Sequence, residues 1–215
     1  ENIADSPVMQ ISGSGVETIS ATDMTKASAT SYTYSWTVPA GNGTQTFALA
    51  TGTDAAGNAI TAAPTSGATI TVDNTAPTAA LAYTVGSSAV TTVKQGNTVT
   101  ITATFNENIA DSPVMQISGS GVETISATDM TKASATSYTY SWTVPAGNGT
   151  QTFALATGTD AAGNAITAAP TSGATITVDN TAPTASLAYT ISSSAVSNVK
   201  QNDVVILTAT FNENI

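Results

Sequence analysis

The sequence predicts an all-β chain of tandem immunoglobulin-like β-sandwich repeats, with about seven strands in each 106-residue repeat. Three observations indicate this fold. Residues 1–79 recur unchanged as residues 107–185, an offset of 107 − 1 = 106 residues. Short runs of alternating apolar and polar residues are separated by turn residues, as in sandwich domains. Thr, Ser, Ala, Val and Gly dominate, whereas helix-favouring side chains are scarce.

The period itself indicates the size of the folding unit. A repeat of about 100 residues is too long for a solenoid unit and fits one small sandwich domain. The period returns a third time, because Phe105–Ile109 reappears as Phe211–Ile215. Ten positions differ between the two periods, and all of them lie between Ala80 and Ile101.

The strands of one repeat are expected in a regular order along the chain. The expected ranges are 79–85, 97–105, 113–118, 122–128, 138–144, 151–159 and 171–179. The clearest is 138–144, where Tyr138, Tyr140 and Trp142 alternate with polar residues. That alternation predicts a half-buried strand with an aromatic inner face. Pro145 and the Asn148–Gly149 turn end this strand.

Two copies of a Pro-bearing polar hexamer, Asp73–Thr78 and Asp179–Thr184, mark the expected domain boundaries. Such a segment between two strands is a short, stiffened linker. Residues 1–74 then form a partial domain with strands C to G but without strands A and B. Residues 75–180 form a complete domain, and residues 181–215 supply strands A and B of a third repeat. Because the chain opens in mid-repeat, we expect it to be a fragment of something longer.

The incomplete repeats suggest a second hypothesis. Without strands A and B, the first segment would expose core residues and an open sheet edge. Residues 181–215 are the missing piece, with Val205, Leu207, Ala209 and Phe211 expected to point inward. The tail of one molecule could therefore complete the head of the next. The alternative is arbitrary trimming of a longer array.

Charge and composition exclude several classes of partner. The formal net charge is −10 and only four Lys oppose the acids. We therefore expect no nucleic-acid binding, which needs clustered cations, and no attraction to anionic membranes. No apolar run is long enough for membrane insertion as a helix. The absence of Cys and His removes disulfides and the commonest general base, so we expect no enzyme activity.

The acidic residues suggest how a chain without disulfides is stiffened. In an immunoglobulin-like topology, the linker should meet the B–C and F–G loops at one pole of the complete domain. That pole would gather Asp73, Asn74, Glu107, Asp111 and Asp160. Several carboxylates with carbonyl oxygens form the hard oxygen cage that Ca²⁺ prefers, while Mg²⁺ demands stricter geometry. The sequence therefore predicts a calcium site at the joint.

Further candidate ligands extend this hypothesis. Asn164 could bind the metal or merely hold its turn. Equivalent half-sites are expected at both ends of the chain: Glu1, Asp5 and Asp54 at the head, and Asp179 with Glu213 at the tail. The alternative for the whole set is that Asp-x-x-Gly-Asn is an ordinary turn and that the loop acids are simply solvated.

Three motifs together resemble a known family. They are Asp160–Asn164 after a strand, the linker Val178–Thr184, and Thr102–Glu107 at the end of the second strand. In this order and spacing, the chain resembles the bacterial immunoglobulin-like repeats of very large secreted adhesins and other surface proteins. The resemblance implies calcium-stiffened sandwiches joined end to end, an extracellular place on the bacterial cell surface, and neighbouring repeats as the partners.

From these observations we expect a structural extender or spacer whose joints are made rigid by calcium. One alternative is a subunit that assembles into a filament or surface layer by head-to-tail strand complementation. Another is a carbohydrate-binding adhesin module, which would need Tyr32 or Trp36 exposed, whereas the spacer needs these rings buried. A glycosidase built on Glu107 and Asp160 is the remaining class, and it would lose turnover in Glu107→Gln.

Overall fold

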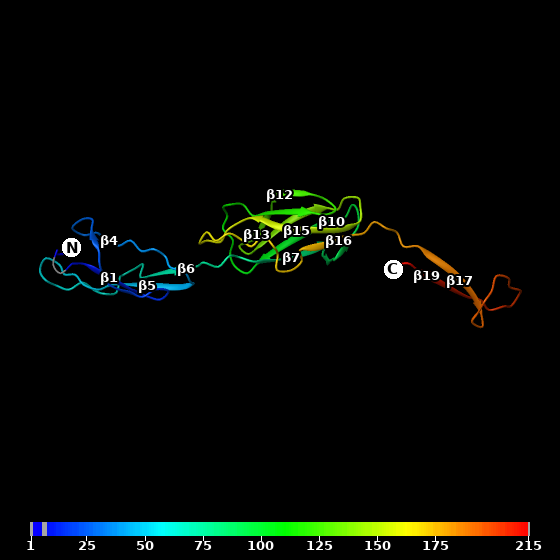
Figure 1. Ribbon diagram of the computed structural model, residues 1–215, viewed down its shortest axis with the longest axis horizontal. Helices are drawn as coiled ribbons and strands as arrows, with labels where there is room; N and C mark the ends of the chain where they lie inside the picture. Colours follow the sequence, from blue (N-terminus) through cyan, green and yellow to red (C-terminus); the bar gives the residue numbers. More distant parts are fainter. Residues whose placement is uncertain (1, 6–7, 215) are drawn as a thin grey trace.

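The computed structural model describes residues 2–5 and 8–214, and none of these residues lies in a helix. The strands form three units that follow one another along an extended molecule (Figure 1). Each sheet contains strands of one unit only, and the sheets divide at residues 73–78 and 179–184. The all-β sandwich class expected from the alternating pattern is confirmed.

The middle unit is a complete two-sheet sandwich. Its strands are β7 (Ala79–Val85), β8 (Ser88–Ala89), β9 (Thr92–Val93), β10 (Thr98–Phe105), β11 (Gln116–Ser120), β12 (Ile125–Asp129), β13 (Thr131–Ser134), β14 (Ser137–Thr143), β15 (Gly149–Thr157) and β16 (Thr175–Val178). One sheet has the order β13-β14-β10-β7-β8 and the other has β12-β11-β15-β16-β9. These orders reproduce the D-E-B-A and C′-C-F-G orders of an immunoglobulin-type sandwich.

The core of the middle unit is built by the inward faces that alternation selects. Val99, Ile101 and Ala103 of β10 are fully buried, whereas the threonines between them face outward. Trp142 packs edge-on against Phe153 with ring centroids 5.4 Å apart. Trp142 and Tyr138 are both buried, so the aromatic strand has the inner face that its sequence predicts.

The first unit has the same sequence as residues 107–180 but only one extended sheet. Its strands are β1 (Gln10–Ser14), β2 (Ile19–Asp23), β3 (Thr25–Lys26), β4 (Tyr32–Thr33), β5 (Gly43–Leu49) and β6 (Thr69–Val72). The sheet order is β2-β1-β5-β6, which matches β12-β11-β15-β16. Among residues 2–5 and 8–74, the two-stranded β3-β4 pair is all that forms of the opposite sheet, because these residues include no counterparts of β7 and β10.

The last unit consists of the counterparts of β7 and β10. Its strands are β17 (Ala185–Ile191), β18 (Ser194–Ala195) and β19 (Ile206–Phe211), in the order β18-β17-β19. The pairing of β17 with β19 repeats that of β7 with β10, for example Leu187 opposite Ala209. Nothing among the described residues covers its apolar face, so Leu187 is 58% exposed.

Several strand limits differ from the sequence prediction for reasons that the contacts explain. The strand expected at 171–179 is only Thr175–Val178. Thr171 instead donates its backbone N–H and its hydroxyl to the Ala79 carbonyl, at 2.8 and 3.1 Å. The short strands β8, β9 and β13 were not predicted, since two to four residues are too few for an alternating pattern.

Candidate metal centre

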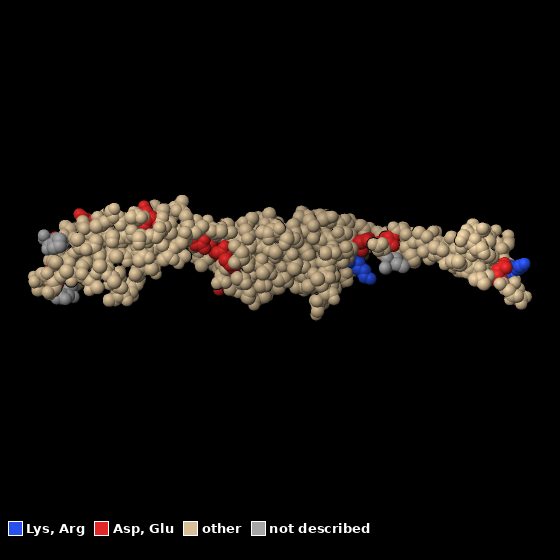
Figure 2. Space-filling model, turned by 90° about the horizontal axis from the view of Figure 1, so that it is seen from below, with Lys and Arg blue, Asp and Glu red and all other residues tan. Residues whose placement is uncertain are grey.

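Three carboxylates meet where the first linker enters the middle unit. Asp73, Glu107 and Asp160 each offer one oxygen, and these oxygens lie within 4.8 Å of one another. Asp160 is buried, while Asp73 and Glu107 are partly buried. They border a surface hollow of ≈ 440 Å³ that Thr71 of β6 also lines. The group therefore lies between the first and middle units, and Figure 2 shows acidic side chains at this joint.

Asp160 is fixed by the turn that follows β15. Its Oδ1 accepts hydrogen bonds from the backbone N–H groups of Gly163 and Asn164, at 2.7 and 2.8 Å. Its Oδ2 accepts a third bond, 2.7 Å long, from the Asn164 side chain. Gly163 has a φ of 97°, a conformation that favours glycine and closes this turn. The carboxylate is thus held in one orientation.

Glu107 reaches the same place from the end of β10. The chain leaves β10 at Phe105 and forms an isolated antiparallel bridge between Ile109 and Asp160. A backbone hydrogen bond of 2.8 Å from Ala110 to Thr159 supports this bridge. The B–C loop is therefore tied to the F–G loop, and Glu107 is brought beside Asp160 as the sequence analysis expected.

Asp73 is contributed by the linker and is braced from the middle unit. The Asn164 side chain donates a hydrogen bond of 3.0 Å to the Asp73 carbonyl oxygen. The Asp73 carboxylate accepts a bond of 3.0 Å from the Thr75 N–H, which turns the linker. Asn164 thus connects Asp160 to the linker backbone. It acts here as a hydrogen-bond donor, which favours the turn-holding alternative for its side-chain nitrogen.

The surroundings of Glu107 and Asp160 shift the pKa values of these two carboxylates in opposite directions. Partial burial, followed by the negative charges of Asp73 and Asp160, raises the pKa of Glu107 above its ordinary value. Burial alone would also raise the pKa of Asp160, but hydrogen bonds from Asn164, Gly163 and Ala162 outweigh it and lower the pKa. The ionised form of Asp160 is therefore favoured, whereas ionisation of Glu107 is disfavoured.

This arrangement has the chemistry of a site for a hard cation. All three acidic side chains offer oxygen, and the described residues bring no Lys into the group. Oxygen ligands suit Ca²⁺ and Mg²⁺ rather than soft transition metals. A bound cation would neutralise the repulsion by Asp73 and Asp160 that adds to the effect of burial in raising the pKa of Glu107. Three acidic residues that could hold a metal ion are thus placed together.

Two of the expected ligands lie outside this group. Asn74 points back to the first unit, where its N–H donates to the Asn42 side chain at 2.6 Å and its side chain donates to the Gly41 carbonyl. Asp111 pairs with Lys132 at the exposed edge of the middle unit. The structure therefore does not bring these two residues into the group, because each is held by another polar partner.

The head half-site is only partly visible, since Glu1 lies outside the described residues. Asp5 pairs with Lys26, as Asp111 does with Lys132 in the middle unit. Asp54 is buried and accepts hydrogen bonds from the N–H groups of Ala56 and Asn58 and from the Asn58 side chain. The turn at the head is therefore built like the turn around Asp160, and Asp5 lies apart in an ion pair.

The tail half-site repeats the linker and the glutamate of the metal centre. The Asp179 carboxylate accepts a bond of 2.9 Å from the Thr181 N–H, as Asp73 does from Thr75. One oxygen of Glu213 is buried and has no hydrogen-bond partner. The counterpart of Asp160 would belong to an F–G loop, which the described residues 181–214 do not include. Figure 2 shows that acidic side chains also gather at this second joint.

Sequence reasoning missed some residues that shape the joint. Asn106 is one, because its side chain accepts a hydrogen bond of 2.7 Å from the Thr78 N–H and its own N–H donates to the Thr78 carbonyl at 3.1 Å. This pair fixes the C-terminal end of the linker. Asn42 fixes the other end through Asn74. The signal available was the recurrence of both asparagines, at 148 and 212, where the same contacts reappear.

No protein-family model matches this chain, and no curated protein is found to be similar to it. The part of the chain that the structure describes also contains no helix long and apolar enough to cross a membrane. The repeat, the fold and the three carboxylates are therefore the features of this chain that bear on its function.

Proposed function

We propose that this chain is a run of structural extender repeats of a secreted bacterial surface adhesin, made rigid by Ca²⁺ bound between the units. The observation that carries the proposal is the group of Asp73, Glu107 and Asp160 at the joint. One ligand comes from the linker and two come from loops of the middle unit. A cation held by all three would fasten the linker to the unit that follows it.

The identity of the metal follows from the kind of site. The ligands lie on two loops and a linker, and such an irregular cage accommodates the six to eight oxygens and variable geometry of Ca²⁺. Mg²⁺ needs near-ideal octahedral coordination, which this cage is less suited to supply. Backbone carbonyls and water would complete the coordination shell. For an extracellular module of this kind we expect a Kd for Ca²⁺ of about 0.1–1 mM.

The mechanical role follows from the shape. The units are joined end to end and the linker is a Pro-bearing segment of only six residues, Asp73–Thr78 (Figure 1). The longest strands of the middle unit, β10 and β15, have eight and nine residues. At about 3.3 Å per residue these strands are roughly 26–30 Å long. An array then gains length in proportion to its number of repeats. A rigid joint prevents the array from bending and so preserves its end-to-end length. The proposed role is therefore mechanical and not enzymatic.

The buried aromatic rings favour a spacer over a sugar-binding module. Tyr138 and Trp142 belong to the core of the middle unit, so they offer no stacking platform there. The indole N–H of Trp142 donates to Glu123 at 2.8 Å, which occupies its polar edge. Tyr32 and Trp36, the residues for which burial was predicted, are only partly buried in the first unit, so the support comes from their counterparts in the complete sandwich.

A calcium titration followed by thermal unfolding tests the proposal. A ligand that binds only the folded form raises the free energy of unfolding. At saturating calcium we expect an increase of about 1–3 kcal/mol in that free energy and a rise in Tm of roughly 5–10 °C. Glu107→Gln should remove most of this rise. Asp129→Asn makes the same charge change on the exposed strand β12, where the Asp129 side chain bonds Gln116 and is not part of the three-carboxylate group, and should leave the rise intact.

The outcomes separate the alternatives. An unchanged Tm at millimolar calcium would leave the three acids as ordinary solvated charge and would contradict the metal. An equal loss in Glu107→Gln and Asp129→Asn would show a nonspecific charge effect instead of a site. Small-angle X-ray scattering tests the extender role separately, since the calcium-loaded chain should scatter as a straight rod.

A further inference from the structure

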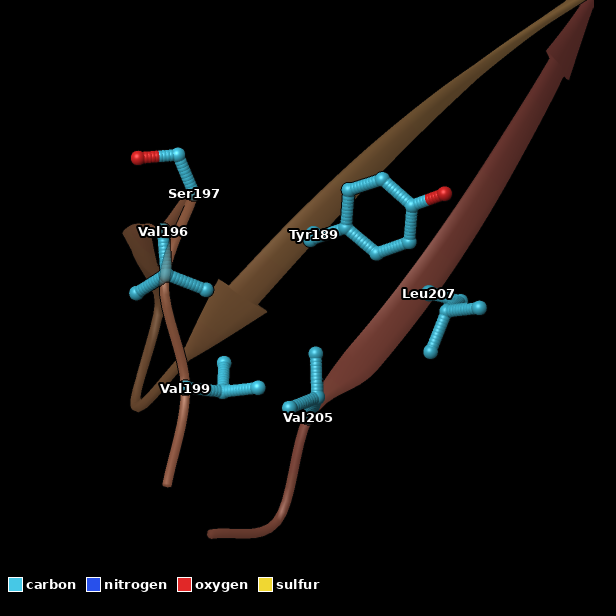
Figure 3. Close-up of a pocket in the computed structure, with 6 residues that line it drawn as sticks. All are labelled: Tyr189, Val196, Ser197, Val199, Val205 and Leu207. Atoms are coloured by element: carbon cyan, nitrogen blue, oxygen red, sulfur yellow. The ribbon is translucent and has the colours of Figure 1, made fainter.

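The apolar hollow of the last unit is the inner side of a sandwich and not a binding site. It has a volume of ≈ 530 Å³, and Figure 3 shows the valines at 196, 199 and 205 and the Tyr189 ring gathered between the strands and the loop. In the middle unit, the counterparts of Tyr189, Val199 and Val205 belong to the buried core. The turns that precede the two linkers, in contrast, have both of their neighbours within the described residues.

Each of these two turns carries the tripeptide Asn-Gly-Thr. Residues 148–150 lead from β14 into β15, and residues 42–44 lead into β5 at the same place of the first unit. The pattern Asn-x-Ser/Thr is the acceptor for N-linked glycosylation. Because 65 of the 215 residues are Ser or Thr, the tripeptide arises easily by chance, and its surroundings decide whether it is a site.

The tripeptide lies at the surface in both units. All three residues of 148–150 are exposed, and so are those of 42–44. Gly149 and Gly43 both have a φ of 138°, a conformation that favours glycine, so the turn depends on the middle residue of the pattern. The hydroxyls of Thr150 and Thr44 have no hydrogen-bond partner among the described residues. The acceptor pattern is therefore open to an enzyme.

The two asparagines form hydrogen bonds through the amide oxygen and leave the amide nitrogen free. Asn148 Oδ1 accepts a bond of 2.5 Å from the Asn180 N–H, and Asn42 Oδ1 accepts one of 2.6 Å from the Asn74 N–H. Neither side-chain nitrogen has a partner within the described part of the chain. Asn74 and Asn180 are the reverse case, since their side-chain nitrogens donate to backbone carbonyls of the same turns.

This difference between the two amide atoms decides which asparagine can take a sugar. N-linked glycosylation substitutes the amide nitrogen and keeps the carbonyl oxygen as an acceptor. A glycosylated Asn148 would therefore retain its bond to Asn180, and the linker would stay fastened to the turn. Substitution at the nitrogen of Asn180 would disturb the bond that this atom donates. The acceptor pattern thus occurs at the asparagine whose contacts tolerate the modification.

We propose that Asn42 and Asn148 are sites of N-linked glycosylation by a sugar that carries a diphosphate leaving group. The amide nitrogen forms a bond to the anomeric carbon of the sugar and loses one proton. The bond between that carbon and the diphosphate breaks, and the diphosphate keeps the electron pair. Two classes of donor share this chemistry, a nucleotide-activated hexose and a lipid-linked oligosaccharide.

The sugar would lie beside an exposed stretch of linker. Residues 74–76 and 180–184 are exposed, and exposed loop segments are preferred sites of proteolytic cleavage. The hydrogen bonds of Asn74 and Asn180 place each tripeptide at the start of such a stretch. An N-linked glycan is bulky and solubilising, so it would shield the joint from proteases. This protective role, but not the chemistry of the site, rests on the extracellular location in the proposed function.

Glycosylation of the purified, folded chain tests the sites. One arm uses UDP-glucose with a soluble N-glycosyltransferase, and the other uses a lipid-linked oligosaccharide with a membrane-bound oligosaccharyltransferase. Intact-mass spectrometry should show two additions per chain in at least one arm, and peptide mapping should place them on Asn42 and Asn148. The arm that reacts identifies the class of donor. No addition in either arm, or additions on other residues only, would overturn the proposal.

A matched pair of variants separates the tripeptide from the strand that carries it. Thr44→Val/Thr150→Val removes the two hydroxyls of the pattern, leaves the asparagines with their linker bonds, and should abolish both additions. Thr46→Val/Thr152→Val makes the same change two residues further along the same exposed strand face and should keep both additions. Equal yields from the two double variants would overturn the proposal.

Limited proteolysis tests the protective role. Proteinase K should cut residues 74–76 and 180–184 at least twofold more slowly in the glycosylated chain than in a chain treated without the sugar donor. Equal rates of cleavage would overturn the protective role.

The calcium titration distinguishes this proposal from the proposed function, because it uses the chain without any sugar. Glycosylation of both asparagines without a calcium-induced rise in Tm would leave the two sites standing and overturn the calcium-bound joint. A normal rise in Tm in a chain that takes up no sugar in either arm would leave the extender function standing and overturn the glycosylation sites.

Discussion

The first and middle units compare one sequence in two settings. Residues 1–74 and 107–180 are identical, yet Ile70 is 51% exposed and Ile176 only 2%. The difference comes from β7 and β10, which cover the sheet of the middle unit and have no counterpart over the first. Burial in a sandwich is thus a property of the pair of sheets and cannot be assigned to one sheet alone.

Other features are the same in both units and show what a single sheet fixes by itself. Gln45 and Gln151 are both fully buried, and each side chain donates to a backbone carbonyl, of Glu17 at 3.0 Å and of Glu123 at 2.9 Å. The turns around Asp54 and Asp160 also share their hydrogen bonds. Local polar contacts therefore form without the second sheet.

The largest expected difference between the units is in their apolar cores. Ile176→Ala should destabilise the middle unit by about 2–5 kcal/mol, because it leaves a cavity. Ile70→Ala should destabilise the first unit by less than about 1 kcal/mol, since the side chain is already half in water. Urea unfolding of single-tryptophan backgrounds checks this, with Trp142 reporting the middle unit and Trp36 the first. Equal losses would mean that the first unit is covered in solution.

Substitution of the buried glutamines should instead affect both units alike. Gln151→Ala and Gln45→Ala each leave buried backbone groups without a partner. Each substitution should therefore lower the free energy of unfolding by about 1–3 kcal/mol. The same unfolding measurement gives both values. A loss confined to Gln151→Ala would show that the polar contacts of the first sheet are not formed independently.

A smaller difference is expected at the two asparagines that follow the buried aspartates. Asn164→Ala removes bonds to Asp160 and to the Asp73 carbonyl. Asn58 makes the bond to Asp54, and the described residues contain no linker bond like that of Asn164. The extra bond is worth about 0.5–1.5 kcal/mol. Hydrogen exchange at Thr75 and Thr78 should therefore quicken in Asn164→Ala and stay unchanged in Asn58→Ala.

The smallest expected effect is on pH dependence. The pKa of Glu107 is raised in the folded protein. Its contribution to calcium-free stability is therefore present below the unfolded pKa and is lost as pH rises through the folded pKa. Without calcium, Tm should rise slightly as Glu107 takes up its proton on mild acidification. Glu107→Gln should abolish this dependence, and an unchanged slope in that variant would contradict the assignment.

Calcium should reverse the sign of that dependence. Protons compete with the cation for Glu107, so the calcium-induced rise in Tm should shrink as pH falls. The lowered pKa of Asp160 keeps its carboxylate ionised over the same range. A calcium effect that does not change with mild acid would point to ligands other than Glu107.

Much of this architecture follows from the sequence, and the exceptions have physical causes. The repeat and the alternation at 138–144 predict the sandwich, and topology alone brings Glu107 and Asp160 to the linker. The places of Asn74 and Asp111 could not be predicted. Each is captured by a polar partner from another loop or strand, Asn42 in one case and Lys132 in the other. Such pairings depend on side-chain geometry that strand patterns do not contain.

The central claim is that calcium immobilises the joint, and an interspin distance tests it most directly. Thr22→Cys and Thr128→Cys place spin labels at equivalent exposed positions of β2 and β12, one on each side of the linker. Double electron–electron resonance should give one narrow distance distribution in calcium and a broad one in EDTA, and Glu107→Gln should stay broad in both. Distributions of equal width with and without calcium would contradict the account.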